Sequence, residues 1–89
     1  MSFRDNFEDC RYELDEGAGV VFATYRDRDG VRALLHFETP KAERGKGAAA
    51  RLMQAILDEA RASGRKLLAR CSYAVDYLGK HNEARDVLN

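Results

Sequence analysis

One segment of the chain repeats its apolar residues at intervals of three and four, and this helical spacing dominates the fold prediction. Residues 48–62 are rich in strong helix formers. Their apolar side chains form a single stripe, made of Ala49, Leu52, Met53, Ile56 and Ala60. Segments at 31–39 and 66–72, rich in apolar residues, flank this helix and are predicted strands. A strand, a helix and a strand in this order form a right-handed crossover with two parallel strands.

The chain before this crossover is typical of a β-meander. Residues 10–14 alternate apolar and charged side chains, and residues 20–25 are β-branched and aromatic. A turn that ends at Gly30 joins the second segment to the strand at 31–39. Pro40 ends that strand, because proline has no N–H group to donate to a neighbouring strand.

The two ends of the chain carry weaker patterns. Residues 1–9 are polar and predict a frayed start, and mixed segments near 73–79 and 82–88 predict short helices. Gly64 is expected to end the long helix. The order β-β-β-α-β-α predicts one domain of the α+β class, residues 1–89. An antiparallel meander, one crossover and short C-terminal helices then pack in a sandwich-like arrangement.

The charge of the chain is balanced, with 15 basic and 15 acidic side chains among 89 residues. This balance excludes a strongly charged whole-molecule field, and with it the simplest argument for nucleic acid or membrane binding. The two halves differ, however. Residues 1–43 carry six basic and ten acidic side chains, whereas residues 44–89 carry nine and five. A small anion would therefore find its best site in the second half.

The apolar segments and the cysteines indicate the cellular compartment in which the protein is expected. No run approaches the roughly 18 apolar residues of a membrane-spanning helix, and the start of the chain lacks the apolar stretch of a signal peptide. Cys10 and Cys71 lie far apart, as expected of two free thiols in a cytoplasmic protein. With two histidines and no CxxC or HExxH motif, no metal site is expected.

Residues 44–49, with the sequence RGKGAA, stand at the start of the predicted long helix. The first N–H groups of a helix have no intrahelical partner and attract anions. Gly45 and Gly47 let a ligand approach the backbone, and Arg44 and Lys46 add positive charge. The loop predicts a phosphate or pyrophosphate site, and the alternative is a solvated, charged helix start.

Three nucleotide-binding motifs can be compared with this loop. The Walker pattern is absent. The loose dinucleotide form G-x-G-x-x-A fits residues 45–50, but that fold needs several β-α-β units and an acidic residue at the end of the next strand. This chain has one such unit, and Cys71 and Ser72 stand at that point. The third form, R-x-x-G-x-A, is met by Arg44, Gly47 and Ala49.

This third form resembles the pyrophosphate loop of the GCN5-related N-acetyltransferases. Two further segments, HFETP at 36–40 and CSYAVDYL at 71–78, are similar to those of short acetyltransferase-like proteins of the YjdJ type. The resemblance is strongest over residues 36–81. Three positions carry residues other than the threonine, valine and proline that are commoner in such proteins: Phe37, Thr39 and Ser72.

The resemblance implies a minimal acetyltransferase fold that binds acetyl-coenzyme A (acetyl-CoA). The pantetheine arm is expected along residues 37–39 in a gap between the parallel strands, the pyrophosphate on residues 44–49, and the thioester toward Glu38 and Cys71. Larger relatives have two helices between their first strands that wall the acceptor site, whereas only residues 15–19 join the corresponding strands here. We expect an open acceptor side that admits a bulky amine or a protein surface, or that a partner completes.

Five side chains are candidates for the chemistry, each with a plainer alternative. Cys71 could take the acetyl group covalently, or be a small buried side chain. Glu38 could act as a general base, or pair outward with an arginine. His36 is expected on the same face as Glu38 from the period-two spacing of a strand, and it could relay a proton, or be a half-buried histidine. Tyr73 and Tyr77 could protonate the leaving thiolate, or serve in packing.

The expected function is acetyl-CoA-dependent transfer of an acetyl group to an unidentified amine, a small molecule or a protein, by direct attack or through Cys71. The predicted contacts with the cofactor are Phe37, Glu38, Thr39, Arg44, Gly45, Lys46, Gly47, Ala48, Ala49, Cys71 and Tyr77. The adenosine 3′-phosphate could meet Lys41, Arg51 or Lys80, and Cys10 is expected to be structural. The alternative function is a non-catalytic module or subunit that binds coenzyme A or an acyl-coenzyme A.

Overall fold

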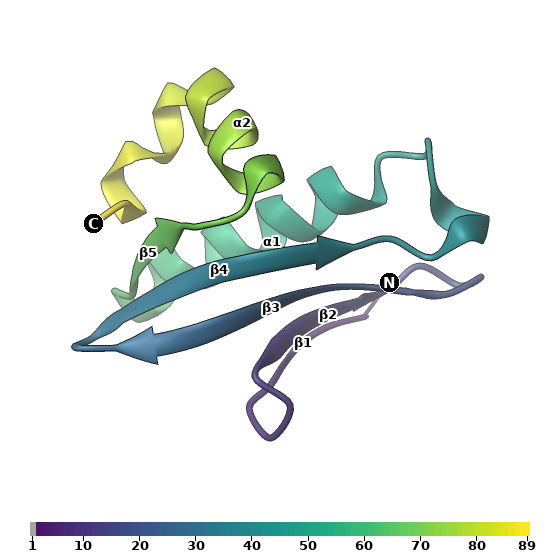
Figure 1. The fold of residues 1–89 in the computed structure, drawn as a ribbon, viewed down its shortest axis with the longest axis horizontal. Coiled ribbons are helices and arrows are strands. Elements are labelled where there is room, and N and C mark those ends of the chain that lie inside the picture. The colour runs from purple at the N-terminus through teal and green to yellow at the C-terminus, as the bar shows by residue number, and fades with distance from the viewer. Residues whose placement is uncertain (1) are drawn as a thin grey trace.

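The computed structural model describes residues 2–89, in which five strands, two α-helices and two short 3-10 helices follow one another. The elements in chain order are β1 (Ser2–Asn6), β2 (Arg11–Asp15), β3 (Val20–Arg28), β4 (Val31–Glu38), η1 (Lys41–Glu43), α1 (Ala48–Ser63), β5 (Lys66–Ala69), α2 (Ser72–Lys80) and η2 (Asn82–Val87). The strands lie side by side in the order β1-β2-β3-β4-β5 (Figure 1).

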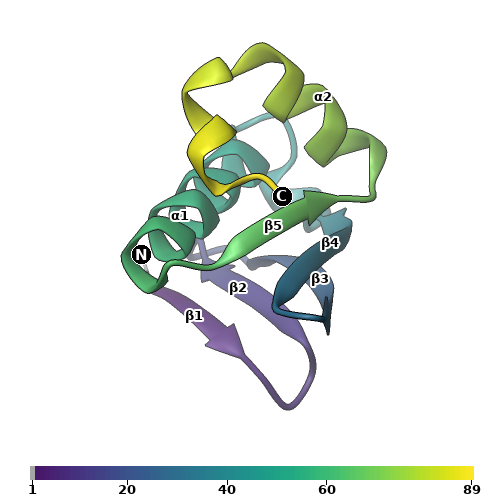
Figure 2. The same cartoon turned by 90° about the vertical axis from the view of Figure 1, so that its left-hand side faces the viewer.

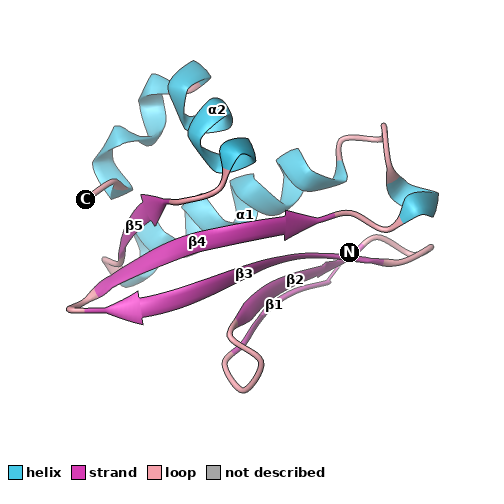
Figure 3. Cartoon of the chain, viewed as in Figure 1, coloured by secondary structure: helices cyan, strands magenta, loops and turns pink. Residues whose placement is uncertain are grey.

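The sheet combines the two pairing modes that the sequence predicts. β1 to β4 form an antiparallel meander, and β4 pairs with β5 in parallel. α1 connects these two parallel strands, which confirms the crossover (Figure 3). Gly64 ends α1 in the left-handed conformation with φ 73°, as expected. The α+β class is therefore confirmed.

β1 is the element that the sequence pattern misses. The prediction of a frayed start at residues 1–9 is wrong, because Ser2–Asn6 pair with β2 as an edge strand; Met1 lies outside the described residues. The ring of Phe3 stacks on Tyr12 with 5.6 Å between ring centroids. Phe3 packs against the hydrophobic core, but one aromatic residue among polar neighbours gives no alternating signal in the sequence.

Several predicted boundaries also shift, and β3 extends to Arg28 rather than ending at residue 25. β2 begins at Arg11, because Cys10 takes a positive φ of 51° in the preceding turn. β5 ends at Ala69 rather than at residue 72, because the chain turns there and Cys71 becomes the N-cap of α2. The last predicted helix is the 3-10 helix η2. Cys71 therefore lies at a helix start and not within a strand.

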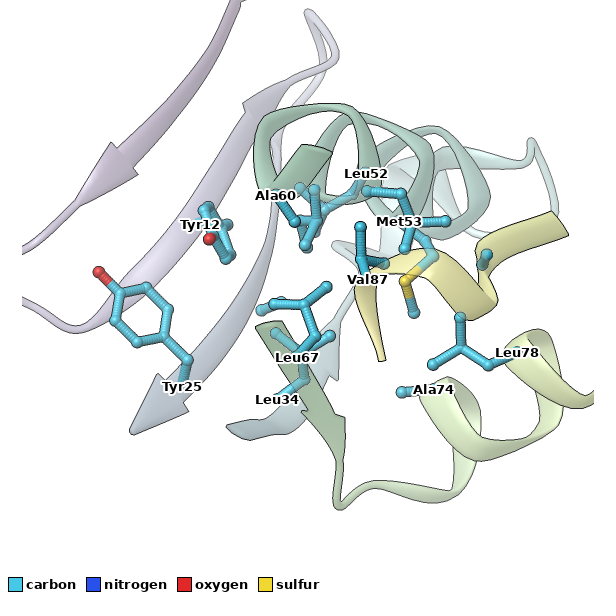
Figure 4. Close-up of a cluster of buried hydrophobic side chains, with 14 of the residues drawn as sticks. Tyr12, Tyr25, Leu34, Leu52, Met53, Ala60, Leu67, Ala74, Leu78 and Val87 are labelled. Atoms are coloured by element: carbon cyan, nitrogen blue, oxygen red, sulfur yellow. The ribbon is translucent and has the colours of Figure 1, made fainter. Parts of the chain in front are cut away.

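α1 supplies the centre of the hydrophobic core through the stripe that the sequence predicts. The members of the stripe that are fully buried are Leu52, Met53, Ile56 and Ala60 (Figure 4). Ala48 is also buried, whereas Ala49 is only half-buried, so that the stripe begins one residue earlier than predicted. Side chains from the sheet meet this stripe, and α2 and η2 close the core on the remaining side.

An extra residue in β4 interrupts the regular alternation of its side chains. The register between β3 and β4 shifts by one residue, which leaves Leu35 without a partner as a β-bulge. Leu34 is fully buried in the core, and Phe37 packs against the same core beyond the bulge. His36 and Glu38 are thereby turned to the opposite face of the sheet.

The helices gather on one side of the sheet (Figure 2). The other side, called the open face below, is formed by the outward side chains of β3, β4 and β5, and no helix of residues 2–89 covers it. Residues 16–19, the β2–β3 turn, join those two strands without a helix, as expected. None of the helices in the described chain has both the length and the apolar character needed to cross a membrane.

Candidate active site

β4 extends beyond its neighbour β5, and this free end is the first feature of the candidate site. The parallel pairing runs from Val31 to Leu34, after which the Arg70 N–H donates to the Leu34 carbonyl at 2.9 Å. β4 continues to Glu38, while the chain after β5 turns into α2. Within residues 2–89 no strand pairs with residues 35–38 on this side. An exposed strand edge of this kind can bind an extended ligand.

His36 and Glu38 lie on the open face at this free end. His36 Nε2 is 2.8 Å from Glu38 Oε1, and the two side chains are 60% and 45% exposed. The shared face that the period-two spacing predicts is therefore confirmed. An imidazole next to a carboxylate can accept a proton and pass it on to solvent, as a general base does.

On the opposite side of the sheet, Phe37 meets Tyr73, a residue of the first turn of α2. Their ring centroids lie 4.9 Å apart, and Tyr77 continues the aromatic row along α2 toward His81. Burial raises the pKa of the Tyr73 hydroxyl, and neighbouring acidic groups add to the shift. Burial likewise raises the pKa of Tyr77. Both phenols therefore hold their protons at neutral pH, which a general acid requires.

The loop before α1 presents a helix N-terminus without a cap. Gly47 is the N-cap residue, with a left-handed φ of 79° that glycine adopts readily, and no side chain caps the first turn. The Arg51 N–H donates to the Gly47 carbonyl at 3.0 Å, so that the N–H groups of residues 48–50 have no partner within the helix. Such a terminus attracts anions.

The basic side chains of this loop are exposed to solvent. Arg44 Nε donates to the Thr39 carbonyl at 3.1 Å, which joins the loop to the segment after β4. Lys46 is exposed beside Gly47. Both can therefore add positive charge to the helix start.

Two contacts support the loop from the β2–β3 turn. Arg51 forms an ion pair with Glu16, and its Nη1 donates to the Lys46 carbonyl at 2.8 Å. The buried carboxylate of Glu43 accepts the Ala18 N–H at 3.1 Å. The loop is therefore attached to the sheet at points that the sequence motif does not reveal.

The β2–β3 turn is also in close contact with Pro40, at the start of the loop. Gly19 lies so close to Pro40 that an added Cβ atom would be 2.9 Å from two atoms of the proline ring. This separation is shorter than real Cβ contacts, so only glycine fits there without a shift of the backbone.

A shallow cavity of about 240 Å³ joins the loop, the residue after β4 and the first turn of α2. Six of the predicted cofactor contacts line it: Thr39, Arg44, Gly45, Gly47, Ala48 and Ala49. Tyr73 lines it from α2. Glu43 and Ala50 also line it, although the sequence does not single them out. Ala50 could have been included, because its N–H belongs to the first helical turn.

Cys71 is half-buried and caps α2, a role that its predicted place in a strand did not suggest. Its Sγ accepts the Ala74 N–H at 3.4 Å. This contact fixes the sulfur atom close to the point where pairing with β4 ends, at the hydrogen bond from the Arg70 N–H to the Leu34 carbonyl. Cys10 is exposed in the turn before β2, away from this site.

Two of the three basic residues predicted for the 3′-phosphate already have acidic partners. Arg51 is paired with Glu16, and Lys80 Nζ lies 3.2 Å from a carboxylate oxygen of Asp76. Lys41 is exposed on η1. Throughout residues 2–89, no group of three His, Cys, Asp or Glu side chains is placed to hold a metal ion.

The structure thus divides the candidate residues into two groups on either side of the free end of β4. His36 and Glu38 face outward from the sheet, whereas Phe37, Tyr73 and the loop lie on the helix side. A ligand along the strand edge would have a proton acceptor on one side and a proton donor on the other.

Comparison with known proteins gives a family and a fold. Among solved structures, the solution NMR structure of a GCN5-like candidate N-acetyltransferase from Staphylococcus aureus is similar, with a TM-score of 0.70 and 24% identity over 99% of this chain and 87% of that chain. At this identity the likeness shows the fold. No curated protein matches the sequence. A family model described as GCN5-related N-acetyl-transferase matches residues 11–87, from the start of β2 to the end of η2. The chain therefore belongs to the GCN5-related N-acetyltransferase family.

Proposed function

We propose that the protein transfers an acetyl group from acetyl-CoA to a primary amine. One observation carries the proposal: the free end of β4 is followed, after residues 39–47, by an uncapped helix N-terminus. A pantetheine arm can pair with the backbone of residues 35–38, and its pyrophosphate can bind the N–H groups at the start of α1. The cavity that begins at Thr39 supports this path.

The two groups of candidate residues suggest how protons move in the reaction. Acetyl-CoA would supply an acetyl group activated as a thioester. Glu38, with His36 2.8 Å away, accepts the proton of the attacking amine on the open face. Tyr73, which holds its proton at neutral pH, gives that proton to the leaving thiolate on the helix side. The backbone of β4 orients the acetyl group between them.

We favour direct attack by the amine over an acetylated Cys71 intermediate. Cys71 already has a structural contact, since its Sγ accepts the Ala74 N–H and caps α2. Direct attack leaves this capping contact intact, whereas the sulfur of an acetylated Cys71 would be a poorer acceptor for the Ala74 N–H. Cys71 then lines the acetyl site without taking part in the bond changes.

The test is a calorimetric titration with acetyl-CoA of the wild type and two charge variants. Ala49→Glu places a carboxylate in the loop cavity, whereas Gln54→Glu places the same charge on the exposed side of α1. A carboxylate in the first turn stabilises a helix, so Ala49→Glu should fold normally, as its thermal unfolding will show. We expect Ala49→Glu to weaken acetyl-CoA binding by about tenfold or more and Gln54→Glu to leave it unchanged. No binding by the wild type at millimolar acetyl-CoA would overturn the proposal.

A second candidate function is a coenzyme A-binding module without turnover. It is favoured by the β2–β3 turn, which leaves the acceptor side without helical walls. This alternative predicts normal acetyl-CoA binding with no acetylation of any amine in a broad panel. Acetylation of any one amine in that panel would favour the enzyme over the binding module.

The setting that we propose is the cytoplasm, with residues 1–89 acting as one domain. Cys10 and Cys71 are both free thiols, which suits a reducing compartment. The balanced charge of the chain favours an amine acceptor over nucleic acid or a membrane as the partner.

A further inference from the structure

The open face carries a groove of about 510 Å³ that borders the proposed acetyl-CoA site at Leu35. Its floor is apolar and consists of Val31, Ala33 and Leu35 from β4 and Leu68 from β5. Its rim is basic and consists of Arg26, Arg28 and Arg70. An apolar floor between cationic side chains is complementary to a ligand that has both carboxylates and apolar groups.

The rim arginines are available to such a ligand. Arg26 and Arg70 are exposed, and neither forms an ion pair with any group of residues 2–89. Arg28 lies 3.9 Å from Asp29, the one acidic side chain in the lining, to which Asn89 also belongs, but both side chains of the pair are almost fully exposed. An exposed pair at this distance contributes little and is easily exchanged.

The groove leads to the proposed acetyl site. At one end Leu35 precedes His36, and Arg70 precedes Cys71 in the sequence. The other end lies at the hairpin between β3 and β4, beside Asp29. Leu35 and Val31 lie four residue steps apart along β4, which corresponds to about 13 Å. A single amino acid covers only part of this length, whereas an extended peptide of about four residues fills it.

We propose that this groove binds the acceptor of the acetyl transfer, and that the acceptor is an extended acidic peptide with its reactive amine at the Leu35 end. The inference rests on the proposed function. Carboxylates that follow the amine along the peptide meet Arg26 and Arg70, and an intervening apolar side chain covers Ala33. Because no helix walls the groove, the peptide can continue beyond both ends.

The first test compares two peptides of equal length that contain one lysine. In one peptide the lysine is followed by glutamates that alternate with leucine, and in the other glutamine replaces each glutamate. We expect kcat/KM for acetylation to be about tenfold higher for the acidic peptide at low salt, and the preference to shrink as ionic strength rises. Equal values for the two peptides would overturn the inference.

The second test removes the rim charges one at a time. Arg26→Gln and Arg70→Gln should each raise KM for the acidic peptide about fivefold, with kcat and the reaction of the neutral peptide unchanged. Arg85→Gln removes the same charge from an exposed position on η2, outside the groove, and should change neither reaction. Equal effects of all three variants would mean that only net charge matters, which contradicts a specific groove.

The third test separates this inference from the proposed function. Titration of the ¹⁵N-labelled protein with the acidic peptide needs no acetyl transfer, and amide shifts are expected at Val31, Ala33 and Leu68. Normal acetyl-CoA binding without these shifts overturns the groove and leaves the proposed function standing. If the amide shifts occur but acetyl-CoA does not bind, the proposed function is overturned and the groove is retained as a peptide site. If free glutamate is acetylated faster than the peptide, the acceptor is a small molecule, and the inference of a peptide acceptor is overturned.

Discussion

His36 Nε2 and Glu38 Oε1 lie 2.8 Å apart on the open face, although the residue between them packs its ring against Tyr73 on the other side of the sheet. One strand therefore presents proton-accepting groups to one side and contacts a protonated phenol on the other. This separation leads to distinct expectations for the two groups.

Replacement of Glu38 by glutamine should lower kcat by about 10²- to 10⁴-fold, because the proposed proton acceptor is lost. The dissociation constant for acetyl-CoA should not change, since the carboxylate faces away from the loop cavity. Steady-state kinetics and calorimetry measure the two quantities. Glu8→Gln, at an exposed position in the turn between β1 and β2, is the matched control. Weaker acetyl-CoA binding by Glu38→Gln would instead place the carboxylate in the cofactor site.

Tyr73→Phe should keep the ring that packs on Phe37 and lose the proton donor, which we expect to lower kcat about tenfold to 100-fold. Burial raises the pKa of Tyr73 above its ordinary value of 10.0. Activity that depends on this proton should therefore persist to pH 10 and decline only as the pH passes the raised pKa. A pH–rate profile measures the effect. Unchanged kcat would show that water or another group protonates the thiolate.

Cys71→Ser should retain most of the activity, because serine also caps a helix and direct transfer needs no thiol. Cys10→Ser, in an exposed turn, is the comparison for the loss of a thiol elsewhere. Intact-mass spectrometry of the wild type after incubation with acetyl-CoA should show no acetyl group on Cys71. An acetylated Cys71 together with an inactive serine variant would establish the covalent route.

Gly19→Ala should lower the free energy of unfolding by about 1–3 kcal/mol, because the new methyl group overlaps the ring of Pro40. Gly79→Ala is the matched control, since open space surrounds that position in α2 and an alanine there should stabilise by about 0.5–1 kcal/mol. Urea denaturation compares the two variants. Equal stability would show that Pro40 moves away freely.

The protein should lose stability in alkaline solution. Burial is the largest cause that raises the pKa of the Tyr12 and Tyr25 hydroxyls far above 10. A raised pKa means that the folded state holds these protons more tightly than the unfolded chain does. Their contribution is therefore complete below the unfolded value and is lost as pH rises above it. Urea denaturation from about pH 9 to pH 12 should show constant stability below the unfolded value of about 10 and a fall above it, and Tyr25→Phe should make the fall shallower.

Features that depend on neighbouring residues could be predicted from the sequence. α1 carries its own apolar stripe and its terminal Gly64, so its position requires no knowledge of distant contacts. The loop motif occupies six consecutive residues at the start of that helix, and the period-two spacing places His36 and Glu38 on one face.

Features that depend on distant residues could not be predicted in this way. The bulge at Leu35 arises from the register with β3, and without it His36 would point to the same side as the buried Leu34. β1 is held in part by the contact of Phe3 with a residue of the next strand. The support that Glu43 gives to Ala18 joins two loops that lie far apart in the chain.

The supports between the β2–β3 turn and the loop before α1 have a consequence for affinity. A flexible loop must lose conformational entropy when it closes on a ligand, and this loss weakens binding. Here Glu16 and Glu43 hold the loop to the sheet through contacts within the chain itself. The entropy of ordering is therefore lost during folding, and a ligand meets a preorganised surface.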